Sequence, residues 1–333
     1  MHIRARVIVV NWNGQRWLAD CLRSIDAQQE AGVEVVLVDN ASTDGSVDYV
    51  RRQFPGVRVV ALDRNEGFAK ANNLGAKDAS CDYLVFLNND TRARPGWLRA
   101  LFAAADRNQD VGLVASRLVY MDRPDLIDSA GDGYLRCGGA YKMWHGRPAA
   151  TAPGERDVFG VCGAAFLIRR SLFEALGGFD ERFFMIYEDV DLSFRARLRG
   201  ARIVYAPDAT VDHAGSASIG RVSADAVFYG QRNLEWTWFV NMPRPLLWRS
   251  LGSHLAYDLT GLAAYARQGR LLSWLRGKAA AMMQLPAAIG ARRHVQRSLC
   301  VDSEALWDLM EPNWTAIKRQ EKQFDFGPAS VHD

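Results

Sequence analysis

The sequence predicts an α/β protein built on a mostly parallel central sheet, and two observations carry that prediction. Short apolar runs alternate with segments of helical periodicity from Ala5 onward, which is the pattern of parallel strands joined by crossover helices. The apolar run at residues 83–87 is too short for a helix and rich in β-forming residues, as expected of a buried central strand. With 333 residues, 49% of them hydrophobic, the chain can bury a substantial core.

Composition narrows the possible functions. The net charge of +3 is too small to indicate a nucleic-acid partner. The five cysteines show no C-x-x-C spacing, which favours a reduced compartment over a disulfide framework or a zinc site. The sequence contains no recognisable signal peptide and no uncharged apolar run long enough to span a bilayer. We therefore expect a cytoplasmic protein.

Four strands are predicted in the first part of the chain, at residues 5–11, 33–39, 57–62 and 83–87. Each is followed by a polar turn and then by apolar residues at helical spacing, so the strands should lie parallel in one sheet. No G-x-G-x-x-G sequence follows the first strand and no Walker A sequence occurs, which argues against the common dinucleotide and P-loop sites.

Later elements are predicted in the same way. Strands are expected at residues 112–116 and 201–205, with a helix at 97–105 between the fourth and fifth strands. Residues 120–153 are irregular and rich in glycine and aromatic residues. We expect this segment to form a hairpin or flap over the crevice at the sheet edge.

The predicted strands share a polar ending. Asn11 and Asp39 end the first two strands, Asn65 lies just past the third, and Asp90 follows the fourth. Helix capping explains each of these residues singly, but it does not explain polarity at every strand end. Because ligands of open α/β sheets bind beyond the carboxyl ends of the strands, these side chains should converge on one crevice.

The chemistry of these residues suits a nucleotide. The Asp39 carboxylate can accept a hydrogen bond from the imide N–H of uracil or thymine, and Asn65 can contact the same base or its ribose. Asp90, flanked by Asn88 and Asn89, can hold a divalent cation against a diphosphate. The alternative is that these three residues only form a turn and a helix cap.

Four motifs together resemble the inverting family-2 glycosyltransferases, and within them bacterial rhamnosyltransferases of surface polysaccharide assembly. The motifs are Val9–Gly14, Val38–Ser46, Asn65–Phe68 and Asn88–Asp90, within a likeness that covers roughly residues 5–220. The resemblance implies a GT-A fold, a nucleotide-sugar donor and a metal at a D-x-D position. This sequence departs from a strict D-x-D, because Asn88 replaces the first Asp and leaves Asp90 as the carboxylate ligand.

We expect the donor to be bound by a set of mainly amide and glycine residues: Asn11, Asn13, Asp39, Asn65, Gly67, Asn72, Asn88, Asn89 and Arg221. The resemblance assigns the metal to Asp90 and to His213, which matches a histidine beside the donor diphosphate in related enzymes. An imidazole ligand favours Mn²⁺ somewhat over Mg²⁺. Residues 216–220 are expected to form a mobile loop that closes on the diphosphate, with Arg221 as a phosphate partner.

The segment Glu188–Arg199 is predicted to be a helix with acidic residues in its first turn. The helix macrodipole alone favours that arrangement, and we interpret Asp191 in this way. The E-D motif of the family falls on Glu188 and Asp189. The resemblance assigns the general base to Asp189, with Glu188 orienting the acceptor or supporting the base.

The acceptor is expected to contact Gly163, Ala164 and Tyr187. The first two belong to a run of small residues within 159–170, where the backbone can approach a ligand closely. Tight packing between a sheet and a helix is the alternative reason for small residues there.

The C-terminal third has a different character. Residues 221–322 are predicted to be helical beyond a transferase domain at 1–220, and 323–333 to be a disordered tail. Between Asn241 and Cys300, nine Lys or Arg residues accompany one acid, Asp258. Basic residues beside Trp and Leu on short helices favour an in-plane helix on an anionic membrane. A soluble helical subdomain with an Arg-rich face is the alternative.

The sequence thus predicts an inverting, metal-dependent glycosyltransferase that lies peripherally on the inner face of the cell membrane. By resemblance, it moves L-rhamnose from dTDP-L-rhamnose to a sugar hydroxyl of a lipid-linked or polysaccharide acceptor. A UDP-hexose transferase and a catalytically silent nucleotide-binding scaffold are the alternatives. A sugar-nucleotide pyrophosphorylase should carry a Gly-rich, Arg- or Lys-bearing loop after its first strand, and Asn11–Gly14 lacks these features.

Overall fold

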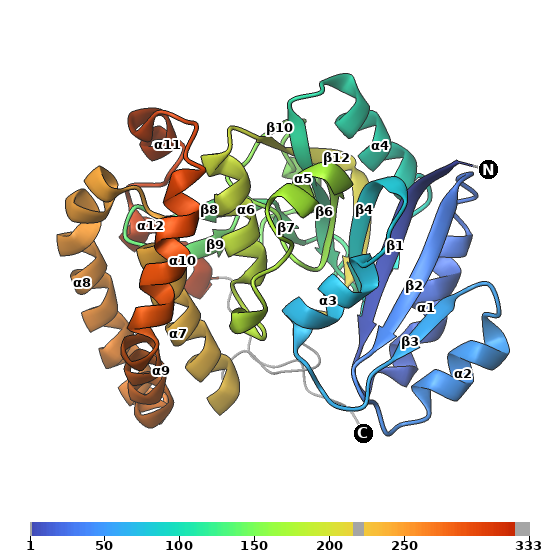
Figure 1. The fold of residues 1–333 in the computed structure, drawn as a ribbon, viewed down its shortest axis with the longest axis horizontal. Coiled ribbons are helices and arrows are strands. Elements are labelled where there is room, and N and C mark those ends of the chain that lie inside the picture. The colour runs from blue at the N-terminus through green and yellow to red at the C-terminus, as the bar shows by residue number, and fades with distance from the viewer. Residues whose placement is uncertain (1, 216–222, 324–333) are drawn as a thin grey trace.

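A computed structural model describes residues 2–215 and 223–323. One mixed sheet with helices on both faces forms the first two thirds, and the helices α7–α12 gather on one side of it (Figure 1). Across the sheet, neighbouring strands follow the order β10-β12-β6-β11-β4-β1-β2-β3. The predicted α/β class is therefore confirmed.

The first four strands pair in parallel, as their alternation with helices predicted, and they lie in the order β4-β1-β2-β3. The strands are β1 (Ile3–Asn11), β2 (Val33–Asp39), β3 (Arg58–Ala61) and β4 (Cys81–Asn88). The helices between them are α1 (Gln15–Asp26), α2 (Ser46–Gln53) and α3 (Phe68–Ala76). The register places Asn11 opposite Asp39, so the polar strand ends are neighbours.

The other half of the sheet is mixed. The strand β11 (Ala165–Arg169) runs antiparallel between β4 and β6 (Val111–Tyr120), whereas β12 (Arg202–His213) runs parallel to β6. The sequence predicted β6 and β12 too short. An irregularity between Ala206 and Thr210 interrupts the pairing of β12 with β6, and the strand then continues to His213.

A short strand that the sequence did not predict, β5 (Thr91–Ala93), pairs antiparallel with the end of β12. Its register places Thr91 opposite His213. Three residues carry too little periodicity to be recognised as a strand. This pairing brings Asp90 beside His213, because Asp90 immediately precedes β5.

The segment expected to form a hairpin or flap contains β7 (Ile127–Ala130), β8 (Asp132–Tyr134) and β9 (Ala140–Lys142). β7 pairs with β6, and β8 and β9 form a separate antiparallel hairpin with Asp132 opposite Lys142. The short β10 (Arg156–Asp157) then pairs with β12. The hairpin prediction is confirmed.

Buried apolar side chains cover both faces of the sheet. One cluster lies under α1 and α4 (Trp97–Arg107) and includes Leu18, Trp97 and Leu101. The cluster on the other face lies under α3, α5 (Arg170–Ala175) and α6 (Glu188–Leu198), and includes a group of packed rings: Phe86, Phe166, Phe173 and Phe179.

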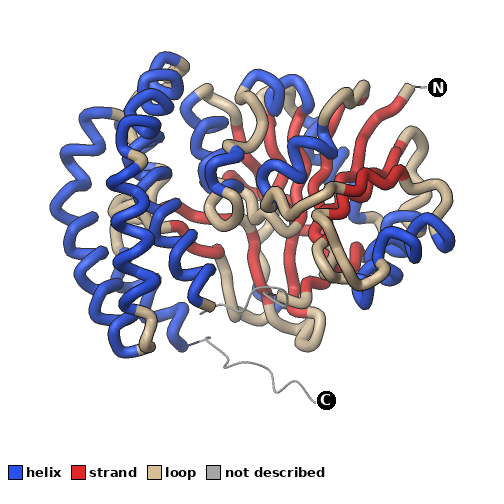
Figure 2. The backbone as a smooth tube through the Cα atoms, turned by 60° about the horizontal axis from the view of Figure 1, so that its bottom comes forward, coloured by secondary structure: helices blue, strands red, loops and turns tan. Residues whose placement is uncertain are grey.

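A third core joins α6 to the C-terminal helices and contains Phe194, Trp236, Leu246 and Trp307. The helices are α7 (Ala224–Asn241), α8 (Arg244–Arg267), α9 (Leu271–Met283), α10 (Leu285–Arg297), α11 (Ser303–Asp308) and α12 (Trp314–Gln323). They form a layer that is almost wholly helical (Figure 2). None of the helices in the described ranges has the length and apolarity needed to cross a membrane. Gln323, which was assigned to the tail, ends α12, and 324–333 lie outside the described residues.

Candidate active site

The ends of β1, β2 and β4 meet in one hydrogen-bonded network. Asn11 Nδ2 donates to Asp39 Oδ1 at 2.9 Å, and Asn89 Nδ2 donates to Asn11 Oδ1 at 2.7 Å. Gly14 fits beside this network only because it lacks a side chain, since a Cβ there would lie 2.1 Å from Asn89 Nδ2. The predicted convergence of these strand ends is therefore present in the fold.

Asp39 is 1% exposed, and the backbone N–H of Ser42 donates to its Oδ2 at 2.8 Å. Asn13 holds the same loop from the other side, because its Oδ1 accepts from the Thr43 N–H at 2.8 Å. Both carboxylate oxygens of Asp39 thus have partners within the protein. A contact from Asp39 to a nucleobase remains a prediction.

Asn65 and Gly67 lie in a second loop at this edge. Asn65 Oδ1 accepts from Asn40 Nδ2 at 2.8 Å and from the Gly67 N–H at 2.9 Å. Gly67 has a φ of +83°, and a Cβ there would lie 2.6 Å from Phe184. Asn72 is 1% exposed, and its side-chain amide donates to Phe68 O of the same helix, α3, at 3.0 Å. A contact from Asn72 to the donor remains a prediction.

The candidate metal ligands Asp90 and His213 face each other. His213 Nε2 lies 3.6 Å from Asp90 Oδ1, and the backbone of Ala214 donates to Asp90 O at 3.0 Å. The other ring nitrogen, Nδ1, lies 2.7 Å from Asp128 Oδ2. A carboxylate that holds one nitrogen of a histidine and leaves the other free for a cation is the usual second shell of a metal site.

Asp128, on β7, was missed by the sequence analysis. Its side chain is completely buried, and Lys142 Nζ donates to its two oxygens at 2.7 and 2.8 Å. Burial alone would raise the pKa of Asp128, but Lys142 and His213 hold it well below the usual range. Only the pairing of β7 with β6 brings this carboxylate to His213, so no local signal identifies it.

As metal ligands, the Asp90 carboxylate and the His213 imidazole fit a divalent cation such as Mn²⁺ or Mg²⁺. His213 Nε2 and Asp90 Oδ1 offer lone pairs to the same space, and the Asp128 contact fixes the ring orientation. Arg221, the expected phosphate partner, and the loop 216–220 lie outside the described residues.

The candidate base stands at the start of α6, just after Tyr187, whose φ is +75°. Asp189 Oδ2 accepts from the Gly163 N–H at 2.6 Å, and Oδ1 accepts from the Val190 N–H at 2.8 Å. A Cβ at residue 163 would lie 2.9 Å from Asp189 Oδ2, so a glycine is needed there. Burial raises the pKa of Asp189, and these backbone N–H groups oppose that rise.

Glu188 differs from its neighbour. It is 6% exposed, and its buried Oε2 has no hydrogen-bond partner within the described residues. Burial, followed by the charge of Asp189, raises the pKa of Glu188 well above its usual value. A role of Glu188 in supporting the base or orienting an acceptor remains a prediction.

Of the three expected acceptor residues, Gly163 contacts Asp189, while Ala164 and Tyr187 bond to other segments. Ala164 contributes its carbonyl to the Asn88 N–H at 2.8 Å, which joins this segment to β4. Tyr187 Oη accepts from the Ala140 N–H at 3.1 Å and so joins α6 to the β8–β9 hairpin. Acceptor contacts at these residues remain predictions.

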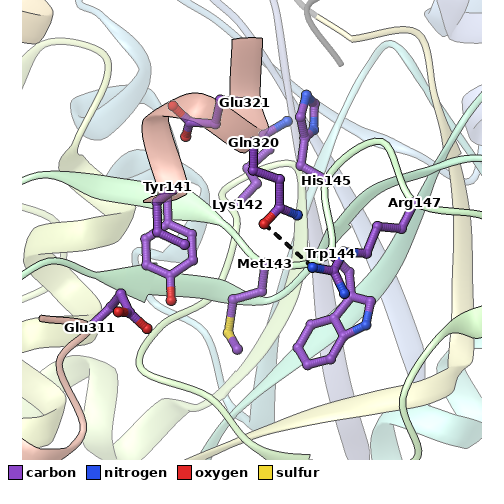
Figure 3. Close-up of a pocket in the computed structure, with 10 residues that line it drawn as sticks. Tyr141, Lys142, Met143, Trp144, His145, Arg147, Glu311, Gln320 and Glu321 are labelled. Atoms are coloured by element: carbon purple, nitrogen blue, oxygen red, sulfur yellow. Dashed lines mark hydrogen bonds between the residues drawn. The ribbon is translucent and has the colours of Figure 1, made fainter. Parts of the chain in front are cut away.

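A pocket of about 230 Å³ lies on the outer side of β9, between the hairpin and α12. Figure 3 shows Tyr141, Met143 and Trp144 on one side and Gln320 and Glu321 on the other. Tyr141 packs over Gly133 of the facing strand, where a Cβ would lie 2.3 Å from its ring. Lys142 lines this pocket and also holds Asp128, so its side chain links the pocket to the candidate metal site.

Comparison with known proteins gives consistent matches. A model of glycosyl transferase family 2 matches residues 6–177. An N-acetylglucosaminyl-diphospho-decaprenol L-rhamnosyltransferase of Mycobacterium tuberculosis is 32% identical over 278 residues, which covers 74% of this chain and 89% of the relative. An O-antigen biosynthesis protein of Myxococcus xanthus is 35% identical over 195 residues, which covers 56% of this chain and 15% of the relative.

A solved structure extends the similarity to the fold. A mannosyltransferase from Pyrobaculum calidifontis, in complex with GDP-Man and Mn²⁺, superposes with a TM-score of 0.56 at 21% identity. The superposition covers 92% of this chain and 88% of the mannosyltransferase. At that identity the likeness concerns the fold alone.

Proposed function

Since the chain belongs to glycosyl transferase family 2 and has the GT-A fold, we propose that it transfers a sugar from a nucleotide-sugar donor to a hydroxyl group with inversion. That it is a glycosyltransferase follows from the family. The proposal concerns the mechanism, the donor, the acceptor and the residues that serve them.

One backbone connection supports the proposed mechanism best. The Asn88 N–H donates to Ala164 O at 2.8 Å, and the preceding residue, Gly163, holds Asp189 Oδ2 at 2.6 Å. The proposed base is thereby tied to the end of the strand that leads to Asp90. A single displacement needs the base and the group that holds the diphosphate fixed relative to one another.

In the proposed reaction Asp189 accepts the proton of the acceptor hydroxyl while that oxygen attacks the anomeric carbon. The new C–O bond forms on the face opposite the diphosphate, whose C–O bond breaks. The nucleoside diphosphate leaves with the electron pair. A divalent cation held by Asp90 and His213 would offset the negative charge of this leaving group.

We propose dTDP-L-rhamnose as the donor and a lipid-linked or polysaccharide glycan as the acceptor. The support is the M. tuberculosis relative, whose name specifies an L-rhamnosyltransferase and an N-acetylglucosaminyl-diphospho-decaprenol. A UDP-hexose is the alternative donor. The presence of Glu188, Asp189 and Asp90 favours an active enzyme over a catalytically silent scaffold.

The C-terminal helices support a peripheral position on an anionic membrane. We define the outer apolar surface as the exposed large apolar residues of α8, α9 and α10: Trp248, Leu255, Leu259, Leu271, Leu272, Leu275, Met282, Met283, Leu285 and Ile289. The segment 241–300 that contains these residues carries nine Lys or Arg and one acid, and of these Lys278 and Asp258 pair with each other inside the protein. Apolar side chains among basic ones bind the headgroup region of anionic bilayers.

Calorimetry of dTDP and UDP binding, each with and without Mn²⁺, tests the donor proposal. We expect metal-dependent binding that is tighter for dTDP than for UDP. A preference for UDP would contradict the rhamnose donor and favour a hexose. Failure of both nucleotides to bind would contradict the proposed donor site as a whole.

A further inference from the structure

A second carboxyl group lies beside the proposed base. Oxygens of Asp132 and Asp189 and the sulfur of Cys162 all lie within 4.8 Å of one another. Asp132 is on β8 and is 9% exposed. Two carboxylates this close in a buried site cannot both ionise easily, because each charge opposes the other.

The hydrogen bonds of the two carboxyl groups differ in kind. Asp189 accepts from two backbone N–H groups, of Gly163 and Val190. Backbone N–H groups can only donate, so they stabilise an ionised carboxylate. No such donor reaches the side chain of Asp132 within the described residues, where its hydrogen-bond partner is the hydroxyl of Ser129 at 3.1 Å.

The hydroxyl of Ser129 is the polar neighbour of the Asp132 side chain. Ser129 is completely buried, and its Oγ lies 2.9 Å from Gly131 O as well as 3.1 Å from Asp132 Oδ1. A hydroxyl has one proton, so Ser129 shares it between the Gly131 carbonyl and Asp132. Asp132 thus has one shared donor, whereas Asp189 has two backbone donors of its own.

The charges around Asp132 have opposing effects on its ionisation. Lys142, which lies opposite Asp132 in the β8–β9 hairpin, directs its Nζ to both oxygens of Asp128 on β7. Burial raises the pKa of Asp132 to about 8, and Asp189 adds to the rise while Lys142 opposes it. Cys162 is half-buried, and burial raises its thiol pKa well above the usual value. Burial raises the pKa of Asp189 as well, but the backbone N–H groups of Gly163 and Val190 oppose that rise. The hydrogen bonds therefore favour the negative charge on Asp189 and the proton on Asp132.

We propose that Asp132 and Asp189 form an acid–base pair in which Asp132 keeps the proton and Asp189 is the ionised member that acts as base. This role rests on the proposed transfer reaction. Asp132 is a positioning residue, because it acts through Asp189. Pairs of titratable groups whose environments separate their protonation states mark the acid and base assignments of active sites. The sequence analysis gave no role to Asp132.

The first test needs no substrate. Carbon-13 NMR of the aspartate carboxyl groups is followed between about pH 4 and pH 10 in the full chain. We expect one resonance to titrate near pH 8 and to be missing in Asp132→Asn. In Asp189→Asn the same resonance should titrate at least about one pH unit lower, because the neighbouring charge is gone. Asp125→Asn, an exposed aspartate of the same segment, is the matched control and should leave it unchanged.

Two results would overturn the pair. One is a resonance, missing in Asp132→Asn, that titrates near the ordinary aspartate value of about 4. The other is a resonance near pH 8 that Asp189→Asn leaves in place. If Asp132→Asn does not fold, the Asp189→Asn shift still decides between the outcomes.

A second test addresses the role. The release of dTDP from dTDP-L-rhamnose is measured at pH 7 with an N-acetylglucosaminyl-diphospho-lipid as the acceptor. Asparagine reproduces the neutral acid, so Asp132→Asn should keep turnover at pH 7 within about threefold, whereas Asp132→Ala should lose at least about tenfold. A tenfold loss in Asp132→Asn at full nucleotide affinity would contradict the role. Absence of turnover in the unaltered protein would instead contradict the proposed donor or acceptor, and the NMR result would stand.

Discussion

His213 Nδ1 lies 2.7 Å from Asp128 Oδ2, and this contact turns His213 Nε2 toward Asp90 Oδ1, 3.6 Å away. The three residues come from separate segments. Asp128 lies on β7, His213 ends β12, and Asp90 immediately precedes β5. The buried carboxylate therefore sets the direction in which a histidine lone pair is offered to a cation.

Replacing Asp128 should weaken metal binding although Asp128 does not itself face the cation. Asp128→Asn removes the charge that orients His213, and losses of this kind cost about 10–100-fold in metal affinity. Calorimetric titration of Mn²⁺ in the presence of dTDP measures the change. Asp122→Asn, an exposed side chain in the same segment, is the matched control. If the Asp128 variant keeps its near-UV circular dichroism spectrum, and so its tertiary structure, an unchanged Mn²⁺ affinity would contradict this assignment.

Replacing Asp189 should abolish transfer and leave the donor site intact. Asp189→Asn cannot accept the acceptor proton, so kcat should fall by about 10²–10⁴. Nucleotide binding, measured by calorimetry, should stay near that of the unaltered protein. Asp208→Asn, at an exposed position in β12, should change neither quantity. Unchanged turnover in Asp189→Asn would show that another group is the base.

Acid should weaken a buried network among the C-terminal helices. Lys278 Nζ donates to Glu235 and, at 2.6 Å, to Asp258, and His254 Nε2 lies 3.1 Å from Glu235 Oε2. Burial alone would raise the pKa of Glu235, but His254 and Lys278 lower it to about 2. Because the folded-state pKa is depressed, the stabilisation is present above the ordinary value and is lost as the pH falls toward 2.

The variant Glu235→Gln measures this contribution. Its free energy of unfolding in urea should lie below that of the unaltered protein at pH 7, by up to about 3 kcal/mol. The difference should shrink as the pH approaches 3, since the unfolded chain binds a proton at Glu235 there while the folded protein, with its pKa of about 2, does not yet do so. Glu304→Gln, whose side chain is 66% exposed and pairs with Arg249, is the control and should show little difference at either pH. A difference independent of pH would contradict the assignment.

Changes to the outer apolar surface should reduce membrane binding. Leu272 and Met283 are 70% and 76% exposed, and the double variant Leu272→Ser, Met283→Ser should lower partitioning onto anionic vesicles by at least about fivefold. Leu309→Ser changes an apolar residue of 47% exposure outside that surface and is the matched control. Flotation with anionic and neutral phospholipid vesicles measures both. Equal partitioning of the unaltered protein onto the two kinds of vesicle would contradict an anionic membrane site.

The sequence predicted the part of the fold in which strands alternate regularly with helices. The strands at 5–11, 33–39 and 83–87 and the polar residues that end them were recognised from apolar runs and turn residues. That these strands run parallel follows from the helices between them, whereas their order β4-β1-β2-β3 and the register that places Asn11 opposite Asp39 come from the structure. The motif around Glu188 and Asp189 likewise marks a helix start that the structure contains.

Contacts between distant segments were not predictable in this way. The strand β5 has only three residues, and nothing at Thr91 indicates pairing with His213. Asp128 and Asp132 lie in a segment without clear periodicity. Their roles depend on which strand β7 joins and on the hairpin that places Asp132 opposite Lys142.

The sequence by itself therefore determined the α/β class, the convergence of the polar strand ends and the residue types offered for a proposed donor, cation and base. Only the tertiary structure decided which carboxyl groups become neighbours, and so which stay ionised. The physical reason is that backbone propensity and periodicity act over a few residues, whereas burial and charge coupling arise between chain segments far apart. The pairs Asp128–His213 and Asp132–Asp189, separated by 85 residues in the first case, exist only after folding.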